Sequence, residues 1–288
     1  MKRTIAQWLE TDHGLGAVSD TPRLDLELLL CRVLGKERSY LFTWPDAALD
    51  AAQQAALEGL LQRRLAGEPI AYITGQQGFW SLDLEVNSST LIPRPETELL
   101  VEVALSLLAD RAGSPCRVAD LGSGSGAIAL ALACERPAWS LVGVDRVAEA
   151  VALANNNAER LRLPNACFVQ GNWCSGLALP AFDLVVSNPP YIDAADPHLG
   201  QGDVRFEPRS ALVAGQQGLA DIRTISEQAR DYLSPGGWLL FEHGFEQGAA
   251  VRELMQSLGY AEVATRQDLA GLDRVTLGRW MERGEAGK

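Results

Sequence analysis

The residues with the clearest chemical potential are Asn188-Pro189-Pro190-Tyr191, which follow an apolar run at Phe182–Ser187. Two prolines fix the backbone and remove two N–H donors, so the nearby carbonyl groups are free to accept hydrogen bonds. A carboxamide or an aromatic amine brings two N–H donors, and the Asn188 side-chain oxygen and the Pro189 carbonyl can accept one each. Tyr191 can pack on the planar group. The segment predicts a clamp for a planar NH₂ group, with amide and adenine equally open.

A glycine-rich stretch, Gly122–Gly126, lies between an apolar strand and an apolar helix. Glycines allow a sharp turn and let a ligand approach the backbone without a Cβ in the way. The strand-turn-helix context favours a ligand site over a plain glycine turn. The spacing is GxGxG, one residue shorter than the dinucleotide GxGxxG, and in methyltransferases this form holds the methionine and ribose parts of S-adenosylmethionine. We therefore expect a cofactor without a pyrophosphate.

Two further residues lie where parallel strands should end. Asp145 ends the strand after the glycine stretch, where its carboxylate can accept both ribose hydroxyls; the alternative is a cap for the helix that starts near Ala148. Trp173 follows the third strand, where its indole can cover an adenine or simply fill the core. Asp120, at the end of the first strand, is a candidate partner for the amino group of the cofactor.

Charge and composition exclude several classes of function. The 288-residue chain has a formal net charge of −12, so it lacks the basic footprint that a long contact with a phosphate backbone needs. The early Lys2-Arg3 pair is followed by acidic residues rather than an apolar stretch, which argues against a signal peptide. No apolar run of about 18 residues occurs, so we expect no membrane span. A cytoplasmic protein that does not bind nucleic acid directly is the simplest interpretation.

The cysteines and histidines do not suggest a metal site. The five cysteines are odd in number and form no CxxC pair, which indicates a reduced cytoplasmic setting. His13, His198 and His243 show neither HxH nor HExxH spacing, so we expect no metal. His243 stands just after an apolar strand, where an apolar residue is expected.

The periodicity divides the chain into three parts. Residues 1–73 read as a helical bundle, with one helix after Pro22 that stops at Gly35 and another at Asp50–Leu65. Residues 74–92 read as a β-hairpin linker, with a strand at Phe79–Val86 and a turn at Asn87–Ser89. The bundle is either a folding appendage or a module that docks a partner.

Residues 93–288 alternate between strand and helix, which predicts a Rossmann-like α/β domain. The last two strands have no convincing helix between them, so they should form an antiparallel hairpin that closes a seven-stranded, mostly parallel sheet. The predicted strands are Arg117–Leu121, Ser140–Val144, Cys167–Gln170, Phe182–Ser187, Gly237–Glu242, Tyr260–Arg266 and Arg274–Arg279, and the predicted helices are Gly126–Glu135, Ala148–Arg160, Gly218–Leu233 and Phe245–Leu258, after one that runs to about Ala109.

Several segments resemble the HemK/PrmC family, the glutamine N5-methyltransferases of peptide chain release factors. Besides the Asn188–Tyr191 motif and the glycine stretch, the similar segments are Gly67–Gly75, Leu91–Glu98, Val204–Leu212 and Asp268–Arg279. The similarity runs from the helical start to about Trp280. The resemblance implies an N-terminal bundle, a β-hairpin and a class I S-adenosylmethionine-dependent methyltransferase domain.

The resemblance also implies an activity: methylation of the side-chain nitrogen of the glutamine in the Gly-Gly-Gln motif of class I release factors. Two other substrates stay open, a glutamine of a large-subunit ribosomal protein and, against the acidic charge, the adenine N6 of DNA. Outside enzymes, a binding protein that acts through the bundle is the remaining alternative. We expect a monomer. Residues Arg94 to Thr97 are expected to close over the methionine end. By position, the cofactor residues are Gly122, Ser123, Gly124, Ser125, Gly126, Asp145, Trp173 and Asn188, and the glutamine site is Asn188, Pro189, Pro190 and Tyr191, of which Asn188, Pro189 and Tyr191 are the predicted catalytic residues.

Overall fold

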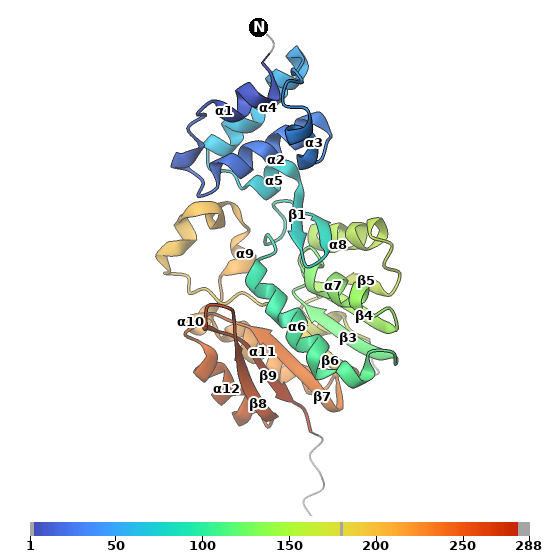
Figure 1. Cartoon of the computed structure of the whole chain (residues 1–288). Coiled ribbons are helices and arrows are strands. Elements are labelled where there is room, and N and C mark those ends of the chain that lie inside the picture. Colours follow the sequence, from blue (N-terminus) through green and yellow to red (C-terminus); the bar gives the residue numbers. More distant parts are fainter. Residues whose placement is uncertain (1–2, 179–180, 282–288) are drawn as a thin grey trace, which may run out of the picture. The chain divides into compact units, whose positions relative to one another are not determined.

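The computed structural model describes residues 3–178 and 181–281, and these form two compact units. One unit comprises Met1–Gln76 together with Pro197–Phe206, and the other comprises Gln77–Asp196 with Glu207–Lys288. Figure 1 shows the helices and strands of both. The outer ends of the first and last predicted domains, at 1–2 and 282–288, lie outside the described residues, as does Lys2 of the early basic pair.

The first unit contains five helices among the described residues: α1 (Ile5–Glu10), α2 (Pro22–Leu34), α3 (Arg38–Thr43), α4 (Ala51–Leu65) and α5 (Ile70–Thr74). Pro22 occupies the first turn of α2, and Gly35 ends the helix with a left-handed φ of 61°. At the start of α4, Asp50 and Gln53 form a reciprocal capping box. Leucines of α2 and α4 are buried together with Trp8 of α1, so this unit has its own apolar core.

The buried side chain of Arg64 forms hydrogen bonds with several segments of the first unit. The side chain of Arg64 is 6% exposed, and its Nε donates to the Asp25 carboxylate at 2.7 Å. Its other nitrogens donate to the Val18 and Glu68 carbonyls and to the Asp203 carboxylate, at 3.1, 3.0 and 3.2 Å. Asp203 belongs to the segment Pro197–Phe206, so one guanidinium connects that segment to α2 and α4.

The β-hairpin has its turn earlier than the sequence predicts. Its strands are β1 (Gln76–Phe79) and β2 (Leu82–Glu85), and Trp80-Ser81 form the turn. The predicted strand at Phe79–Val86 therefore spans the turn and the second strand. The backbone N–H of Trp80 donates to the Glu98 carboxylate at 2.7 Å, a tertiary partner that local sequence does not reveal. Asn87 does form a turn through its side chain, but no strand follows it.

The second unit is built on a seven-stranded sheet of order β5-β4-β3-β6-β7-β9-β8. Strands β3 to β7 are parallel, while β9 is antiparallel to both β7 and β8, as the sequence predicts. The strands are β3 (Cys116–Leu121), β4 (Trp139–Asp145), β5 (Ala166–Gln170), β6 (Phe182–Ser187), β7 (Leu233–Glu242), β8 (Ala261–Gln267) and β9 (Asp273–Arg279), and the helices are α6 (Glu98–Leu107), α7 (Ala127–Glu135), α8 (Ala148–Arg160), α9 (Arg209–Leu212), α10 (Gly215–Gly218), α11 (Ala220–Ala229) and α12 (Gly248–Ser257).

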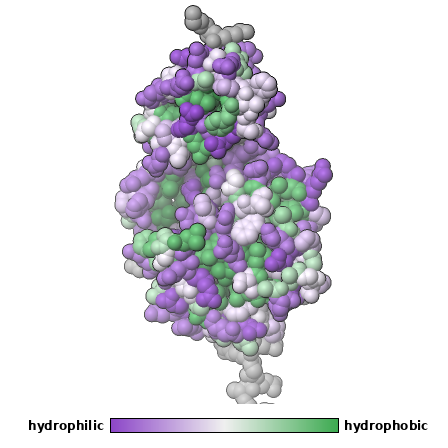
Figure 2. Space-filling view, viewed as in Figure 1, coloured by the Kyte–Doolittle hydropathy of each residue, from purple (hydrophilic) through white to green (hydrophobic). Residues whose placement is uncertain are grey.

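Two apolar cores lie on the two faces of this sheet. One holds side chains of α6, α7 and α8, and the other holds side chains of α11 and α12. Helix α7 is buried at every position from Ala127 to Ala133, which fits its all-apolar sequence. In the space-filling view, hydrophobic residues reach the surface in small groups among hydrophilic ones (Figure 2). No helix in the described part of the chain is long and apolar enough to cross a membrane.

The predicted helix Gly218–Leu233 is shorter in the structure, since α11 covers only Ala220–Ala229 and β7 begins already at Leu233. The short helix α10 ends at Gly218, at its junction with α11. Gly218, at the junction, has a φ of 83°, and a Cβ there would collide with the Tyr191 carbonyl oxygen. The chain breaks at this glycine because the backbone must pass that close to the segment after β6.

Candidate active site

The predicted site residues meet at the carboxyl edge of the sheet, where parallel α/β sheets bind ligands. Leu121 at the end of β3 pairs with Val144 of β4 on one side and with Ser187 of β6 on the other. The residues that follow these strands therefore lie next to one another. Ser187 strengthens the arrangement, because its hydroxyl donates to the Leu121 carbonyl at 2.6 Å directly before the Asn188 motif.

A pocket opens at this edge within the second unit. It includes most of the predicted cofactor residues, but Gly126, Pro189 and Tyr191 do not line it. Residues that the sequence reasoning missed also contribute to it, chiefly from the segments before α6 and around α9. The lining comprises Ser89, Thr90, Leu91, Pro93, Arg94, Thr97, Gly122, Ser123, Gly124, Ser125, Ala127, Ile128, Val144, Asp145, Arg146, Val147, Gly171, Asn172, Trp173, Asn188, Pro190, Ser210 and Ala211.

The glycine stretch turns tightly beneath the pocket. Gly122, Gly124 and Gly126 have φ values of 73°, 53° and 86°, a region that other residues rarely adopt. A Cβ at Gly122 would lie 3.3 Å from the Trp173 ring, so the glycine keeps the loop close to the indole. At Gly126 a Cβ would meet the Phe168 ring at 2.7 Å, which makes this last glycine a packing requirement of the core.

The carboxylate of Asp145 lies between the glycine stretch and the residue before α8, and its predicted contact with ribose hydroxyls stays a prediction. One oxygen accepts from the Gly124 backbone N–H at 2.9 Å, and the other accepts from the Val147 N–H at the start of α8, also at 2.9 Å. Each carboxylate oxygen has a further lone pair, so two donors from a ligand can still bind. Asp145 thus orders the glycine loop and faces the pocket.

The substitution Asp145→Ala is expected to raise the dissociation constant of the cofactor by about 10-fold or more, because charge-assisted hydrogen bonds contribute about 1.5–3 kcal/mol. Titration calorimetry measures this directly. Asp110→Ala is the matched control, since Asp110 is an exposed carboxylate outside the pocket. Equal affinity of the Asp145→Ala variant and the control would contradict the assigned role.

Trp173 lies between the pocket and the core, and its contact with an adenine stays a prediction. It lines the pocket, and at the same time it packs against the core formed with α11 and α12. Its φ of 51° is unusual for a tryptophan and places the ring over Gly122. Asp120, by contrast, is fully buried outside the pocket lining; its Oδ2 accepts from the Ala129 N–H at 3.2 Å, and burial raises its pKa to about 7.

The amide of Asn188 is oriented by a threonine. Its Nδ2 donates to the Thr97 hydroxyl at 3.2 Å, and both residues line the pocket. Since the nitrogen is committed to Thr97, Oδ1 is the atom left to accept from a ligand. The predicted clamp for an NH₂ group stays a prediction, with Oδ1 as one of its two acceptors.

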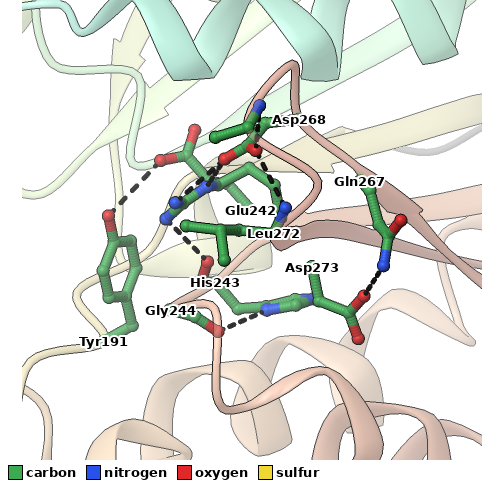
Figure 3. Close-up of polar contacts among 10 residues, drawn as sticks. Tyr191, Glu242, His243, Gly244, Gln267, Asp268, Leu272 and Asp273 are labelled. Atoms are coloured by element: carbon green, nitrogen blue, oxygen red, sulfur yellow. Dashed lines mark hydrogen bonds and ion pairs between the residues drawn. The ribbon is translucent and has the colours of Figure 1, made fainter.

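Tyr191 contacts the buried carboxyl group of Glu242, the last residue of β7. Its hydroxyl donates to Glu242 Oε1 at 3.4 Å (Figure 3). Its carbonyl accepts from Gln247 Nε2 at 3.0 Å. Glu242 is 1% exposed, and burial raises its pKa to about 7. Its sequence signal is an acidic residue that ends an apolar strand, the same signal that identified Asp145.

His243, the unexpected polar residue after β7, has a structural explanation. It is fully buried, and one ring nitrogen contacts the Gly244 carbonyl at 2.9 Å (Figure 3). The other ring nitrogen contacts the Thr276 hydroxyl at 2.8 Å. Burial lowers its pKa, so the ring is neutral at physiological pH. A histidine held in this way joins β7 to β9 and does not reach the pocket.

The segments Leu91–Glu98 and Val204–Leu212 meet beside the pocket through Glu207. This glutamate is buried and accepts from the Ile92 backbone N–H at 3.0 Å and from Arg94 Nη2 at 2.7 Å. Arg94 is one of the residues expected to close over the ligand, and it does line the pocket. The ion pair therefore holds one wall of the site in place.

A seven-stranded sheet with an antiparallel last hairpin, a glycine loop after β3 and an acidic residue at the end of β4 defines a Rossmann-like methyltransferase. A crystallised methyltransferase from Pyrococcus furiosus shares the fold, with a TM-score of 0.53 at 19% identity over 78% of this chain and 100% of its own. Residues 13–75 match the PrmC N-terminal domain, and residues 96–201 match the methyltransferase small domain.

Curated relatives resemble this chain over nearly its full length. The release factor glutamine methyltransferase of Vibrio cholerae is 58% identical over 93% of each chain. Those of Pseudomonas aeruginosa and Escherichia coli are 56% and 50% identical, over 91% and 96% of this chain and 94% and 98% of their own. The chain belongs to the release factor glutamine methyltransferase family.

Proposed function

We propose that the protein transfers a methyl group from S-adenosylmethionine to the side-chain nitrogen (N5) of the glutamine in the Gly-Gly-Gln motif of class I peptide chain release factors. The carrying observation is that Asn188 lines a pocket that also contains the glycine loop, while its side-chain nitrogen donates to Thr97 and leaves Oδ1 as its acceptor. The names of the relatives, which are 50–58% identical, support the same substrate.

The pocket has features that suit this cofactor. The Ser123 hydroxyl is buried and has no hydrogen-bond partner within the described residues, although it lines the pocket. A buried hydroxyl without a partner is costly, and a ligand would satisfy it. Asp145 offers acceptors for the ribose hydroxyls, and Trp173 offers an aromatic face for the adenine.

The reaction needs positioning more than acid-base chemistry. S-adenosylmethionine, when bound, supplies an electrophilic methyl group on a positively charged sulfur. The glutamine amide is a poor nucleophile, so Asn188 and Pro189 serve to hold its NH₂ group in line, which can supply several kcal/mol of the barrier. Their acceptor bonds strengthen as the amide nitrogen becomes positive, and the nitrogen then loses its proton to water.

The partner and the setting of the enzyme follow from the same proposal. We assign partner docking to the helical bundle (residues 1–73), a linking role to 74–92, and catalysis to 93–288. The enzyme acts as a cytoplasmic monomer on a protein substrate, without binding nucleic acid directly. The net charge of −12 supports the absence of direct nucleic-acid binding, because a negatively charged protein is repelled by the phosphates of duplex DNA.

The test is to incubate the protein with labelled S-adenosylmethionine and, separately, a class I release factor, large-subunit ribosomal protein and duplex DNA. We expect label on the release factor, located by mass spectrometry on the glutamine of Gly-Gly-Gln. A release factor whose motif glutamine is replaced by glutamate is the control and should stay unlabelled. Label on ribosomal protein or DNA alone would overturn the proposal.

A further inference from the structure

Glu242 is a buried carboxyl group directly beside the Asn188 motif. Phe241 pairs with Ser187 in the sheet, so Glu242 and Asn188 are the next residues of neighbouring strands. Tyr191 donates to one oxygen of Glu242, but Oε2 makes no hydrogen bond of ordinary geometry within the described residues. Burying a carboxyl group in this way is costly, and functional sites are where such a cost is commonly found.

Thr97 connects Glu242 to the Asn188 amide. It is 4% exposed, it accepts from Asn188 Nδ2 at 3.2 Å, and its hydroxyl lowers the pKa of the Glu242 carboxyl by favouring the charged form. A hydroxyl group has one proton. When Thr97 directs that proton to the carboxylate, only its lone pairs face Asn188, so the amide must present its NH₂ group to Thr97 and its oxygen to the pocket.

We propose that Glu242 is a positioning residue that acts through Thr97 to fix the orientation of the Asn188 amide, and thereby selects a carboxamide over a carboxylate. The inference rests on the proposed function. With Oδ1 toward the pocket, Asn188 accepts from the NH₂ group of glutamine and repels the oxygens of glutamate. If the amide were reversed, the site would offer a donor where the substrate also has donors.

We call the series of contacts from Glu242 through Thr97 to Asn188 the relay. Its direction depends on the charge of Glu242. Burial and, to a smaller extent, Glu96 raise its pKa, Thr97, Arg274 and Tyr191 lower it, and the resulting pKa is about 7. Arg274 approaches from β9 and is itself held by Asp268 at 3.1 Å, while His243 points away to Thr276. Protonated Glu242 would donate to Thr97 and reverse the relay. Methyl transfer should therefore decrease as the pH falls through about 7, because the active form is the deprotonated one.

Four variants test the relay. Glu242→Gln keeps the shape but removes the charge, and Thr97→Val removes the hydroxyl. Each is expected to lower the kcat for methyl transfer by up to about 10²-fold, as a misplaced reacting group does, and Glu242→Gln should abolish the decrease below pH 7. Thr97→Ser should recover most of what Thr97→Val loses. Asp183→Asn, at the opposite end of β6, is the matched carboxyl control and should keep the wild-type kcat.

A readout without substrate separates this inference from the proposed function. In the ¹⁵N-labelled full-length protein, the side-chain NH₂ signal of Asn188, assigned with Asn188→Ala, should shift with a midpoint near pH 7. The shift should vanish in Glu242→Gln and Thr97→Val and return in Thr97→Ser. A signal that does not titrate in the wild type would overturn the relay even if the release factor is methylated. A titrating signal without methylation would instead contradict the proposed function alone.

Discussion

Replacing Asn188 by alanine is expected to lower methyl transfer by about 10²-fold or more while changing cofactor affinity only a few-fold. The Asn188 oxygen is the acceptor that holds the glutamine NH₂ group, and removing one oriented partner of the transition state costs about that much. The neighbouring contacts to a cofactor come from Gly122–Ser125, Asp145 and Trp173, which the substitution leaves in place. Transfer of labelled methyl groups to the release factor and titration calorimetry provide the two measurements.

Asn156→Ala is the matched control for this experiment. Asn156 is exposed on α8, and its side chain donates to the Glu85 carboxylate rather than lining the pocket. This variant should keep wild-type turnover. If Asn188→Ala also turned over at a near-normal rate, the clamp would be wrong, and the amide would have to be held by other groups.

Replacing Arg64 by alanine is expected to lower the free energy of unfolding of the first unit by about 3–5 kcal/mol, as breaking a buried ion pair does. The substitution leaves the Asp25 carboxylate, only 4% exposed, without its counter-charge, and it also removes donors to Val18, Glu68 and Asp203. Urea denaturation followed by circular dichroism measures the loss, with the helical signal of this unit unfolding at a lower denaturant concentration.

Arg63→Ala is the matched control for Arg64→Ala, because it removes the same type of side chain from the neighbouring position of α4. Arg63 pairs with Glu68 with side-chain exposures of 45% and 26%, and exposed pairs contribute up to about 1 kcal/mol. The Arg63 variant should therefore unfold close to the wild type. A loss in the Arg64 variant no larger than this would mean that burial does not strengthen its ion pairs.

The second unit was largely predictable because its strands carry strong local signals. Short apolar runs alternate with helical periods, and the missing helix before the last strand correctly predicted the antiparallel hairpin. The errors occurred where a tertiary contact decides a boundary. Glu98 accepts from Trp80 at the true hairpin turn, and the close approach of Gly218 to the Tyr191 carbonyl separates α10 from α11 at the predicted start of the helix.

The site was predictable where the side chain itself bears the chemistry and follows a strand. The glycine stretch, Asp145, Trp173 and Asn188 all stand at the carboxyl ends of strands, which parallel topology brings to one edge. Thr90, Ser210 and Glu207 could not be found in this way, because they reach the pocket or its wall from loops and from the short helix α9, whose positions are set by long-range contacts such as the Arg94–Glu207 ion pair.

The membership of Pro197–Phe206 in the first unit has a consequence for how the protein is made. The bundle is a discontinuous domain, and its buried Arg64 receives one of its carboxylate partners, Asp203, from a segment 139 residues further along the chain. During synthesis the helices emerge first, but this unit cannot complete its ion-pair network until residue 206 has left the ribosome, after most of the catalytic sheet has already been translated. A gene fragment that ends near Gln76 would encode the helices without the segment Pro197–Phe206, which supplies Asp203 to Arg64.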